Sequence, residues 1–514
     1  MQLIRLGGRT ISQQFSSVYQ IERSMSAKQN YYDLLKIPRD SEPEEIRRAY
    51  HELARVLHPD KNPSAGATDQ FLNLQTAYDT LSDPDRRAAY DKKLKSETEE
   101  PILVDVSYSR KHISILPDES QLVYVLLEMT ATPKLAEQSN PHLNLCLVLD
   151  RSTSMHGARM DTVKSAAIEL VRQTSPEDII SIVAFSDRAE VLVKSDKLTE
   201  RHYIETQIQM MRAGGGTEMF QGLEAGFQEV QRRLNRTMVN HIFMITDGHT
   251  YGDEASCLQL SDRAALQGIR ITGLGIGTEW NDKFIDDLTS RTGGSSSFIA
   301  KTNDLHTLMQ EKFKSLNQVY AERVTLSLDT PPNVVLNSIF RAQPDPSVLP
   351  LSDKVRVGSI QKNSGLTLLL EFIIPSVKEG ASRFSLGTGE LNLVLPFDAA
   401  ATRKIPLVFS RLTSDSQEKE MPSPALFSAL TQLTLYRMQE KASQEVSDGK
   451  VQQASLRLQR LATQLFSLGE VALAQTALME ADRIQQTHML SAEGEKAIKY
   501  GTRAFLLPAK AREV

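Results

Sequence analysis

The sequence contains little cysteine and no long apolar run. Its 514 residues include only two cysteines, Cys146 and Cys257. So few cysteines argue against a disulfide framework and fit a reducing cytosol. Cys146 lies within an apolar stretch, where we expect a small buried side chain. No apolar run approaches the roughly 18 to 20 residues that a membrane-spanning helix needs, so we expect no membrane segment.

A strong excess of charge of one sign is also absent. The chain has 59 basic and 64 acidic residues and a formal net charge of −5. This balance gives no reason to expect nucleic acid or an anionic membrane as a partner. The length predicts about three or four domains, and apolar residues, at 40% of the chain, are enough for several cores.

Residues 1–28 differ from the rest in composition. The first 27 contain Arg5, Arg9 and Arg23, many Ser and Gln, and a single acid, Glu22. This composition resembles an organelle transit peptide. We favour two simpler interpretations, a disordered extension or a start at Met25, because Met25 lies just before the first helical segment.

Residues 29–95 predict two amphipathic helices. Ser41 is a candidate N-cap for the first helix, with Pro43 and Glu44 in its first turn. The apolar positions of the two helices recur at helical spacing: Ile46, Tyr50, Leu53 and Leu57, then Phe71, Leu74, Tyr78 and Leu81. Two such helices joined by a short loop predict an antiparallel hairpin, with His58-Pro59-Asp60 at the start of the loop.

This segment resembles the J domain of the DnaJ family. The resemblance rests on "YYDLL", on His58-Pro59-Asp60 followed by "KNP", and on "AYDTLSDPDRRAAYD". It implies docking on a DnaK-type chaperone and stimulation of its ATP hydrolysis, with His58, Pro59 and Asp60 as the trigger. The basic docking face of the family would correspond to Arg47, His51 and Arg55. Glu52 and Val56 stand where the family commonly has basic residues, so the strength of docking and the choice of chaperone stay open.

In residues 140–317, apolar strands alternate with amphipathic helices. The alternation predicts a mostly parallel, Rossmann-like α/β sheet with helices on both faces. The carboxyl edge of such a sheet is where ligands bind, and three predicted loops there carry hard oxygen donors: Asp150, Ser152, Ser154, Thr217 and Asp247. This set suits Mg²⁺ or Mn²⁺ better than calcium or zinc. The alternative is that the hydroxyl groups only cap local backbone.

The same segment resembles a von Willebrand factor A domain with a complete metal-ion-dependent adhesion site. The resemblance rests on Asp-x-Ser-x-Ser between a strand and a helix, on a threonine preceded by glycines, and on a strand that ends in Thr-Asp-Gly. It implies that Ser152, Ser154 and Thr217 bind the ion directly. Asp150 and Asp247 would act through water and through hydrogen bonds to the serines. One coordination position would stay open for a carboxylate of a partner protein, and we expect His156 to be solvated.

Predicted strands flank this segment, in residues 96–139 and 318–412. The simplest interpretation is a β-sandwich with the A domain inserted between its strands, similar to bacterial A-domain proteins of this layout. The alternative is two unrelated β units. Residues 422–504 carry leucines at helical spacing and predict two or three helical hairpins, without the roughly 34-residue period of tetratricopeptide repeats.

These features together predict a cytoplasmic co-chaperone adaptor that is not an enzyme. The J domain would recruit a DnaK-type chaperone, and the A domain would hold a protein client through its metal. Two alternatives stay open. One is a non-catalytic scaffold that the J domain docks near a chaperone. The other is a metal-dependent hydrolase, although the sequence offers neither a nucleophile elbow nor a His-Glu metalloprotease motif.

Overall fold

The computed structural model contains two compact units, residues 1–100 and 101–514, and each is described by itself. The described residues are 30–57, 67–97, 102–115, 119–132, 141–197, 200–248, 250, 252–301, 304–375, 377, 382–396, 402–414 and 422–505. The extension 1–28 and the motif His58-Pro59-Asp60 therefore lie outside the described residues. Within the described part of the chain, no helix has both the length and the apolar character that crossing a membrane requires.

The first unit contains the predicted pair of long helices. Its elements are α2 (Tyr31–Leu35), α3 (Pro43–Leu57), α4 (Ala67–Leu81) and α5 (Pro84–Glu97). The facing stripes of α3 and α4 pack as expected, with Ile46 and Leu74 fully buried and the rings of Tyr50 and Tyr78 stacked at 4.3 Å. The predicted cap is wrong. The Ser41 hydroxyl is buried and forms no hydrogen bond within the described residues, and the Glu45 carboxylate instead accepts the Glu42 amide at 3.2 Å.

The second unit contains a sandwich of two five-stranded sheets, with orders β1-β3-β14-β11-β12 and β13-β10-β15-β16-β2. Its strands are β1 (Ile102–Tyr108), β2 (His112–Ser114), β3 (Gln121–Ala131), β10 (Val319–Asp329), β11 (Val335–Gln343), β12 (Ser347–Leu349), β13 (Val355–Gln361), β14 (Leu366–Ile374), β15 (Arg383–Val394) and β16 (Thr402–Ser414). Strands β3 and β14 are antiparallel neighbours, with Leu127 opposite Leu368. About 240 residues separate these two leucines in the sequence, so the sandwich is built from two segments of the chain on either side of the α/β domain.

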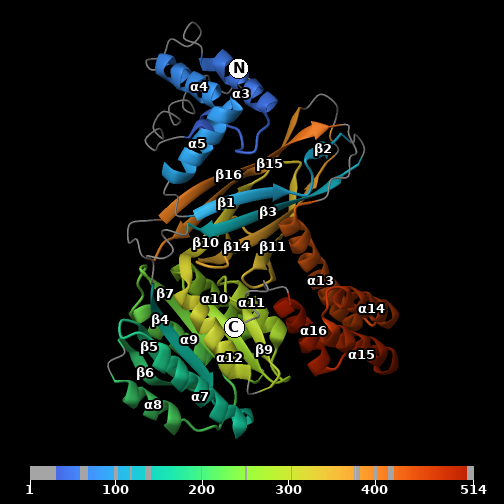
Figure 1. Ribbon diagram of the computed structural model, residues 1–514. Helices are drawn as coiled ribbons and strands as arrows, with labels where there is room; N and C mark the ends of the chain where they lie inside the picture. Colours follow the sequence, from blue (N-terminus) through green and yellow to red (C-terminus); the bar gives the residue numbers. More distant parts are fainter. Residues whose placement is uncertain are drawn as a thin grey trace, which may run out of the picture. The chain divides into compact units, whose positions relative to one another are not determined.

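The α/β domain lies between β3 and β10 in the chain (Figure 1). Its elements are β4 (His142–Asp150), η1 (Thr153–Met155), α7 (Ala158–Gln173), β5 (Ile179–Phe185), β6 (Ala189–Lys197), α8 (Arg201–Met210), α9 (Met219–Arg232), β7 (Met238–Thr246), α10 (Glu254–Gln267), β8 (Arg270–Ile276), α11 (Asp282–Ser290), β9 (Ser296–Ile299) and α12 (Asp304–Asn317). The sheet order is β6-β5-β4-β7-β8-β9, and only the edge strand β6 is antiparallel to its neighbour.

Helices cover both faces of this sheet. Helices α7, α8 and α12 pack on one face of the sheet and α9, α10 and α11 on the other. Each face has one buried apolar cluster that its three helices share with the strands. The strands are buried on both sides, which explains their nearly continuous apolar sequences. Cys146 and Cys257 are both buried free thiols, and burial raises the pKa of Cys146 to about 12. The predicted insertion of an α/β domain into a β-sandwich is thus confirmed.

Four helices follow the sandwich: α13 (Pro424–Ser447), α14 (Val451–Ser467), α15 (Val471–Thr487) and α16 (Ala492–Phe505). The predicted leucines form their core, including Leu435, Leu458 and Leu461. The N-terminal turns of α13 extend this packing to the sandwich, where Leu426 and Leu433 contact Phe340 and neighbouring residues. The C-terminal region is therefore an α-helical domain, as predicted.

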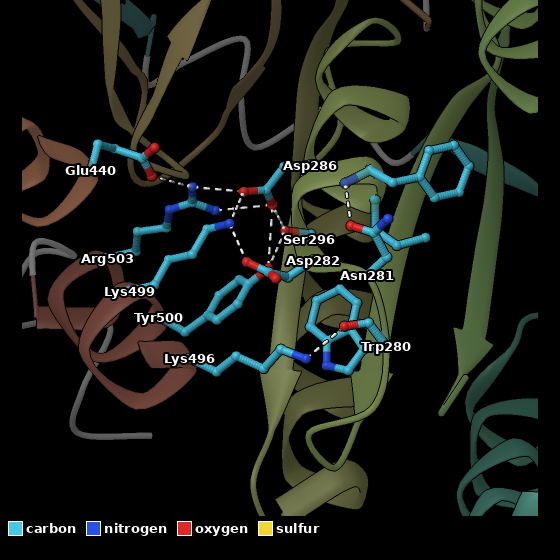
Figure 2. Close-up of polar contacts among 12 residues, drawn as sticks. Trp280, Asn281, Asp282, Asp286, Ser296, Glu440, Lys496, Lys499, Tyr500 and Arg503 are labelled. Carbon is cyan, nitrogen blue, oxygen red and sulfur yellow. Dashed lines mark hydrogen bonds and ion pairs between the residues drawn. The ribbon is translucent and has the colours of Figure 1, made fainter. Parts of the chain in front are cut away.

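Helix α16 lies along the α/β domain beside the edge strand β9 and helix α11 (Figure 2). The Asp286 carboxylate on α11 receives the Arg503 guanidinium at 2.8 and 3.1 Å and the Lys499 ammonium at 2.8 Å. Burial alone would raise the pKa of Asp286, but the charges of Arg503 and Lys499 outweigh it and lower this pKa to about 2. We call these three residues the α16 lock.

Candidate metal centre

The two aspartates of the predicted site lie at the ends of neighbouring parallel strands. Asp150 is the last residue of β4, and Asp247 directly follows β7. These strands pair in register, with Leu149 opposite Ile245. Both carboxylates are therefore at the carboxyl edge of the sheet, and both residues are fully buried.

Asp150 is positioned by hydrogen bonds from the serine loop and from the end of strand β7. Its Oδ1 accepts the backbone amide of Ser152 at 2.7 Å, and its Oδ2 accepts the hydroxyl of Thr246, also at 2.7 Å. Burial raises the pKa of the Asp150 carboxyl, and the nearby charge of Asp247 adds to this effect. Since no ion pair to Asp150 is found among the described residues, this buried carboxyl is a group that a cation would stabilise.

The two serines connect the aspartates. The hydroxyl oxygens of Ser152 and Ser154 are 3.0 Å apart, and the Ser154 hydroxyl donates to Asp247 Oδ1 at 2.7 Å. A continuous hydrogen-bonded set therefore runs from Asp150 through Ser152 and Ser154 to Asp247. Ser152 is buried, whereas Ser154 is exposed, so the set opens toward solvent at Ser154.

Thr217 reaches the same place from a third loop. A Cβ placed on Gly248, the residue after Asp247, would lie 3.4 Å from the Thr217 hydroxyl oxygen. The loop that carries Thr217 is held by backbone contacts with the serine loop: Gly214 N donates to Arg151 O at 2.7 Å, and Thr153 N donates to Gly215 O at 3.0 Å. The structure therefore brings all five predicted residues together at one edge of the sheet.

The donor set fits a hard divalent cation. It comprises two carboxylates and three hydroxyl oxygens, and within the described residues no group of three or more His, Cys, Asp or Glu side chains is placed to hold a metal. Oxygen-only sites of this kind favour Mg²⁺ or Mn²⁺ over zinc, which prefers nitrogen and sulfur. His156 is exposed beside the serine loop, as expected for a solvated side chain.

The sequence analysis missed one charged residue at this site, Arg159. Arg159 lies in the first turn of α7, and its Nη1 is 2.5 Å from Asp247 Oδ2 and 3.3 Å from the Ser154 carbonyl oxygen. A basic residue five positions after the second serine was the only available signal. Its partner could not be deduced, because Asp247 is 88 residues away in the sequence.

The candidate chaperone-docking residues lie on α3 in the other unit. Arg47, His51 and Arg55 are all exposed and share one face of the helix, at steps of four residues. Val56 beside them is 67% exposed, so the departure from a fully basic face is at the surface. Within the same unit, Tyr32 joins α2 to α5: its hydroxyl donates to Asp91 at 2.8 Å and accepts from Arg87 at 3.0 Å.

Three family models match successive parts of the chain. They are the DnaJ domain at residues 30–91, the von Willebrand factor type A domain at residues 144–312, and the Sll0103-like, C-terminal alpha-helical domain at residues 424–508. No enzyme family is among these three. The A-domain match includes all five residues of the candidate metal centre, and the DnaJ match includes His58, Pro59 and Asp60.

Relatives agree with this division of the chain. The uncharacterized protein sll0103 of Synechocystis sp. is 29% identical over 383 residues, which are 72% of this chain and 89% of that protein. Chaperone protein DnaJ 2 of Thermus thermophilus is 49% identical over 67 residues, which are 13% of this chain and 24% of that protein. The likeness to the DnaJ chaperone is therefore limited to the J domain.

A solved structure shares the fold of the larger unit. The von Willebrand factor type A protein from Catenulispora acidiphila has a TM-score of 0.63 and is 14% identical, covering 78% of this chain and 96% of that chain. At this identity the likeness concerns the fold alone. The chain is therefore a multidomain protein with a DnaJ domain, a von Willebrand factor type A domain and an Sll0103-like C-terminal helical domain.

Proposed function

We propose that this protein is a cytoplasmic co-chaperone adaptor. Its J domain would stimulate the ATPase of a DnaK-type chaperone, and its A domain would bind a protein partner through Mg²⁺ or Mn²⁺. The observation that carries the proposal is the presence of both modules in one chain, with five oxygen-bearing side chains gathered at a single edge of the A-domain sheet. The proposal includes no nucleic-acid or membrane partner and no catalysed reaction.

The J domain supports recruitment of a chaperone. Arg47 and Arg55 present positive charge on an exposed face of α3, with His51 between them, and the His-Pro-Asp motif follows α3 directly in the sequence. A basic face attracts an acidic surface, and the attraction increases the rate of encounter. In this proposal, the three basic residues dock the chaperone, and His58, Pro59 and Asp60 trigger hydrolysis.

The A domain supports metal-dependent adhesion. Ser152, Ser154 and Thr217 would hold the ion through their hydroxyl oxygens. Asp150 fixes the serine loop by accepting a hydrogen bond from the Ser152 amide, and Asp247 orients the Ser154 hydroxyl by accepting a hydrogen bond from it. The ion, when bound, would supply a Lewis-acid site for one carboxylate of the partner protein. The solvent-exposed side of Ser154 is where that carboxylate would approach.

The chaperone arm is tested by ATP hydrolysis of a purified DnaK-type chaperone. We expect the full-length protein to stimulate hydrolysis under single-turnover conditions. His58→Gln should reduce this stimulation at least tenfold. The control is His202→Gln, which changes an exposed histidine on α8. Equal stimulation by His58→Gln and the unmodified protein would leave only a scaffold, docked near the chaperone without activating it.

The adhesion arm is tested by titrating Mg²⁺ and Mn²⁺ calorimetrically, followed by partner capture with and without EDTA. Asp150→Ala should weaken metal binding more than tenfold and abolish EDTA-sensitive capture. Asp161→Ala, which removes an exposed carboxylate from the first turn of α7, should change neither. If EDTA leaves every captured partner in place, the metal has no adhesive role. Turnover of phosphoesters or peptides that is lost on chelation would favour a hydrolase instead.

A further inference from the structure

The Asp247 carboxylate already has a cation beside it. Its Oδ1, on the side of the serines, accepts the Ser154 hydroxyl, and its Oδ2 pairs with Arg159 Nη1 at 2.5 Å. The Asp247 side chain is completely buried, whereas the Arg159 side chain is 35% exposed. The guanidinium therefore contacts the oxygen of Asp247 that the serine does not use.

The fold leaves room for the Arg159 guanidinium in this position. Gly277, which follows β8, has φ +74°, and a Cβ placed there would lie 3.1 Å from Arg159 Nη2. A side chain at position 277 would be strained and would crowd the guanidinium. Two segments thus hold the guanidinium: Nη1 donates to the Ser154 carbonyl oxygen, and Nη2 lies against the backbone at Gly277.

This pairing changes the charge that an incoming cation would meet. Asp150 and Asp247 contribute two negative charges, the three hydroxyl side chains contribute none, and Arg159 contributes one positive charge. The site therefore has a net charge of about −1 where the carboxylates alone would give about −2. A lower negative charge weakens cation binding but leaves a bound cation with a greater residual attraction for an external carboxylate.

We propose that Arg159 is a counter-charge that sets the affinity of the candidate metal centre for divalent cations. Its guanidinium neutralises Oδ2 of Asp247 and so lowers the affinity of the site for divalent cations. A cation bound there keeps a stronger attraction for an acidic group of the partner protein. This inference rests on the proposed metal-dependent function. It adds a residue and a direction of effect that the five oxygen donors alone do not predict.

The test is calorimetric titration of Mn²⁺ and Mg²⁺ into the full-length protein. Arg159→Gln retains much of the side-chain length without the charge, and it should bind both ions about tenfold more tightly than the unmodified protein. Arg159→Lys retains the charge without the planar fork, and its affinity should lie between the two. The matched control is Arg151→Gln. Arg151 is adjacent to Asp150 in the sequence but pairs with Glu190 at 3.0 Å, so its loss should change affinity less than twofold.

A second measurement separates counter-charge from simple structural support. Without metal, Arg159→Gln should melt at a lower temperature than the unmodified protein, and saturating Mn²⁺ should give it the larger upward shift. Affinity that is unchanged or weaker in folded Arg159→Gln would overturn the inference while leaving the metal site in place. If Arg159→Gln does not fold, Arg159→Met, which also removes the charge, decides by the same criterion. Absence of metal binding in the unmodified protein and in both variants would overturn the proposed function as well.

Discussion

At the scale of single residues, the path of the Thr217 loop depends on Gly215. This glycine has φ +92°, and a Cβ there would lie 2.6 Å from Asp187 Oδ2. Asp187 is itself committed, because its Oδ1 accepts the Gly216 amide at 2.7 Å. The position therefore demands glycine both for its backbone conformation and for its space. Gly214, one residue earlier, has neither constraint, since a Cβ there would meet no other described residue within 4 Å.

We predict that Gly215→Ala destabilises the protein by about 1–2 kcal/mol, because a left-handed backbone costs that much for a residue with a Cβ. It should also weaken Mg²⁺ binding, since the displaced loop carries Thr217. Gly214→Ala should stay within about 0.5 kcal/mol and retain metal affinity. Chemical denaturation and calorimetry of the two variants check this. Equal losses in both would show that the loop path does not depend on the conformation of Gly215.

The five oxygen donors could be located from sequence because each one follows a buried strand or a glycine run. Such positions meet at one edge of a parallel sheet, so strand order alone brings Asp150 and Asp247 together. The Arg159 contact could not be predicted in the same way. It depends on how a long, flexible side chain extends from α7 and on the space beside Gly277, and neither property has a sequence period.

At the scale of elements, α16 protects the edge of the A-domain sheet. Strand β9 is the last strand in the sheet order, and an uncovered edge strand can pair with other chains. Lys496 secures the N-terminal part of α16 by donating to the carbonyl oxygen of Trp280 at 2.6 Å (Figure 2) and to that of Thr278 at 2.5 Å. Three basic residues at helical spacing thus face the α/β domain, and Tyr500 between them packs on Trp280 and Phe298.

We predict that Asp286→Asn costs roughly 3 kcal/mol, because it removes the counter-ion that the buried Lys499 and Arg503 share. Among the described residues, Lys499 then keeps only its ion pair with Asp282, and Arg503 keeps only that with Glu440 at 3.9 Å. Asp287→Asn is the matched control on the same helix. The Asp287 side chain is 48% exposed and pairs with Arg291, so its loss should cost less than about 1 kcal/mol. Fluorescence of Trp280, the single tryptophan of the chain, reports on this interface, since its ring is 5.7 Å from that of Tyr500. Similar urea midpoints for both variants would contradict a role for the α16 lock.

Secondary structure was largely predictable because its periodicity is local. Alternating apolar strands and helices in residues 140–317, and leucines at helical spacing in residues 422–504, correspond to the observed elements. The docking of α16 was not predicted, because the leucine pattern points to packing among the helices themselves. The signal that could have indicated it is the spacing of Lys496, Lys499 and Arg503, which places three cations on one helix face.

At the scale of the larger unit, buried charge joins the α/β domain to both of its neighbours. The α16 lock connects it to the helical domain. Toward the sandwich, Lys312 of α12 pairs with Asp345 at 2.8 Å, and the buried Arg341 of β11 donates to the carbonyl oxygens of Gly293 and Gly294 at 3.1 and 3.0 Å. Gly293 and Gly294 precede β9, so the contacts of Arg341 lie at the amino edge of the sheet, opposite the candidate metal centre.

Both junctions contain an aspartate whose pKa is lowered to about 2. Burial alone would raise the pKa of Asp345, but the positive charges of Lys312 and Arg341 outweigh it, as Lys499 and Arg503 do for Asp286. A carboxyl whose pKa is lower in the folded than in the unfolded chain stabilises the fold above its unfolded pKa of about 4. This stabilisation is lost as the pH falls from about 4 toward 2.

We therefore predict that acid destabilises the larger unit by protonating Asp286 and Asp345. The effect should appear as a smaller difference in the free energy of unfolding between the unmodified protein and the asparagine variants. The free energy of unfolding of the unmodified protein should exceed that of Asp286→Asn by a constant amount from about pH 7 to about pH 5. Below about pH 4 the difference should decrease by on the order of 2 kcal/mol, since the asparagine cannot titrate. Urea denaturation followed by Trp280 fluorescence at each pH measures it, and Asp345→Asn should behave in the same way. A difference that stays constant down to about pH 2 would mean that Asp286 titrates alike in the folded and unfolded chains, so that the ion pairs of the α16 lock do not stabilise its charge.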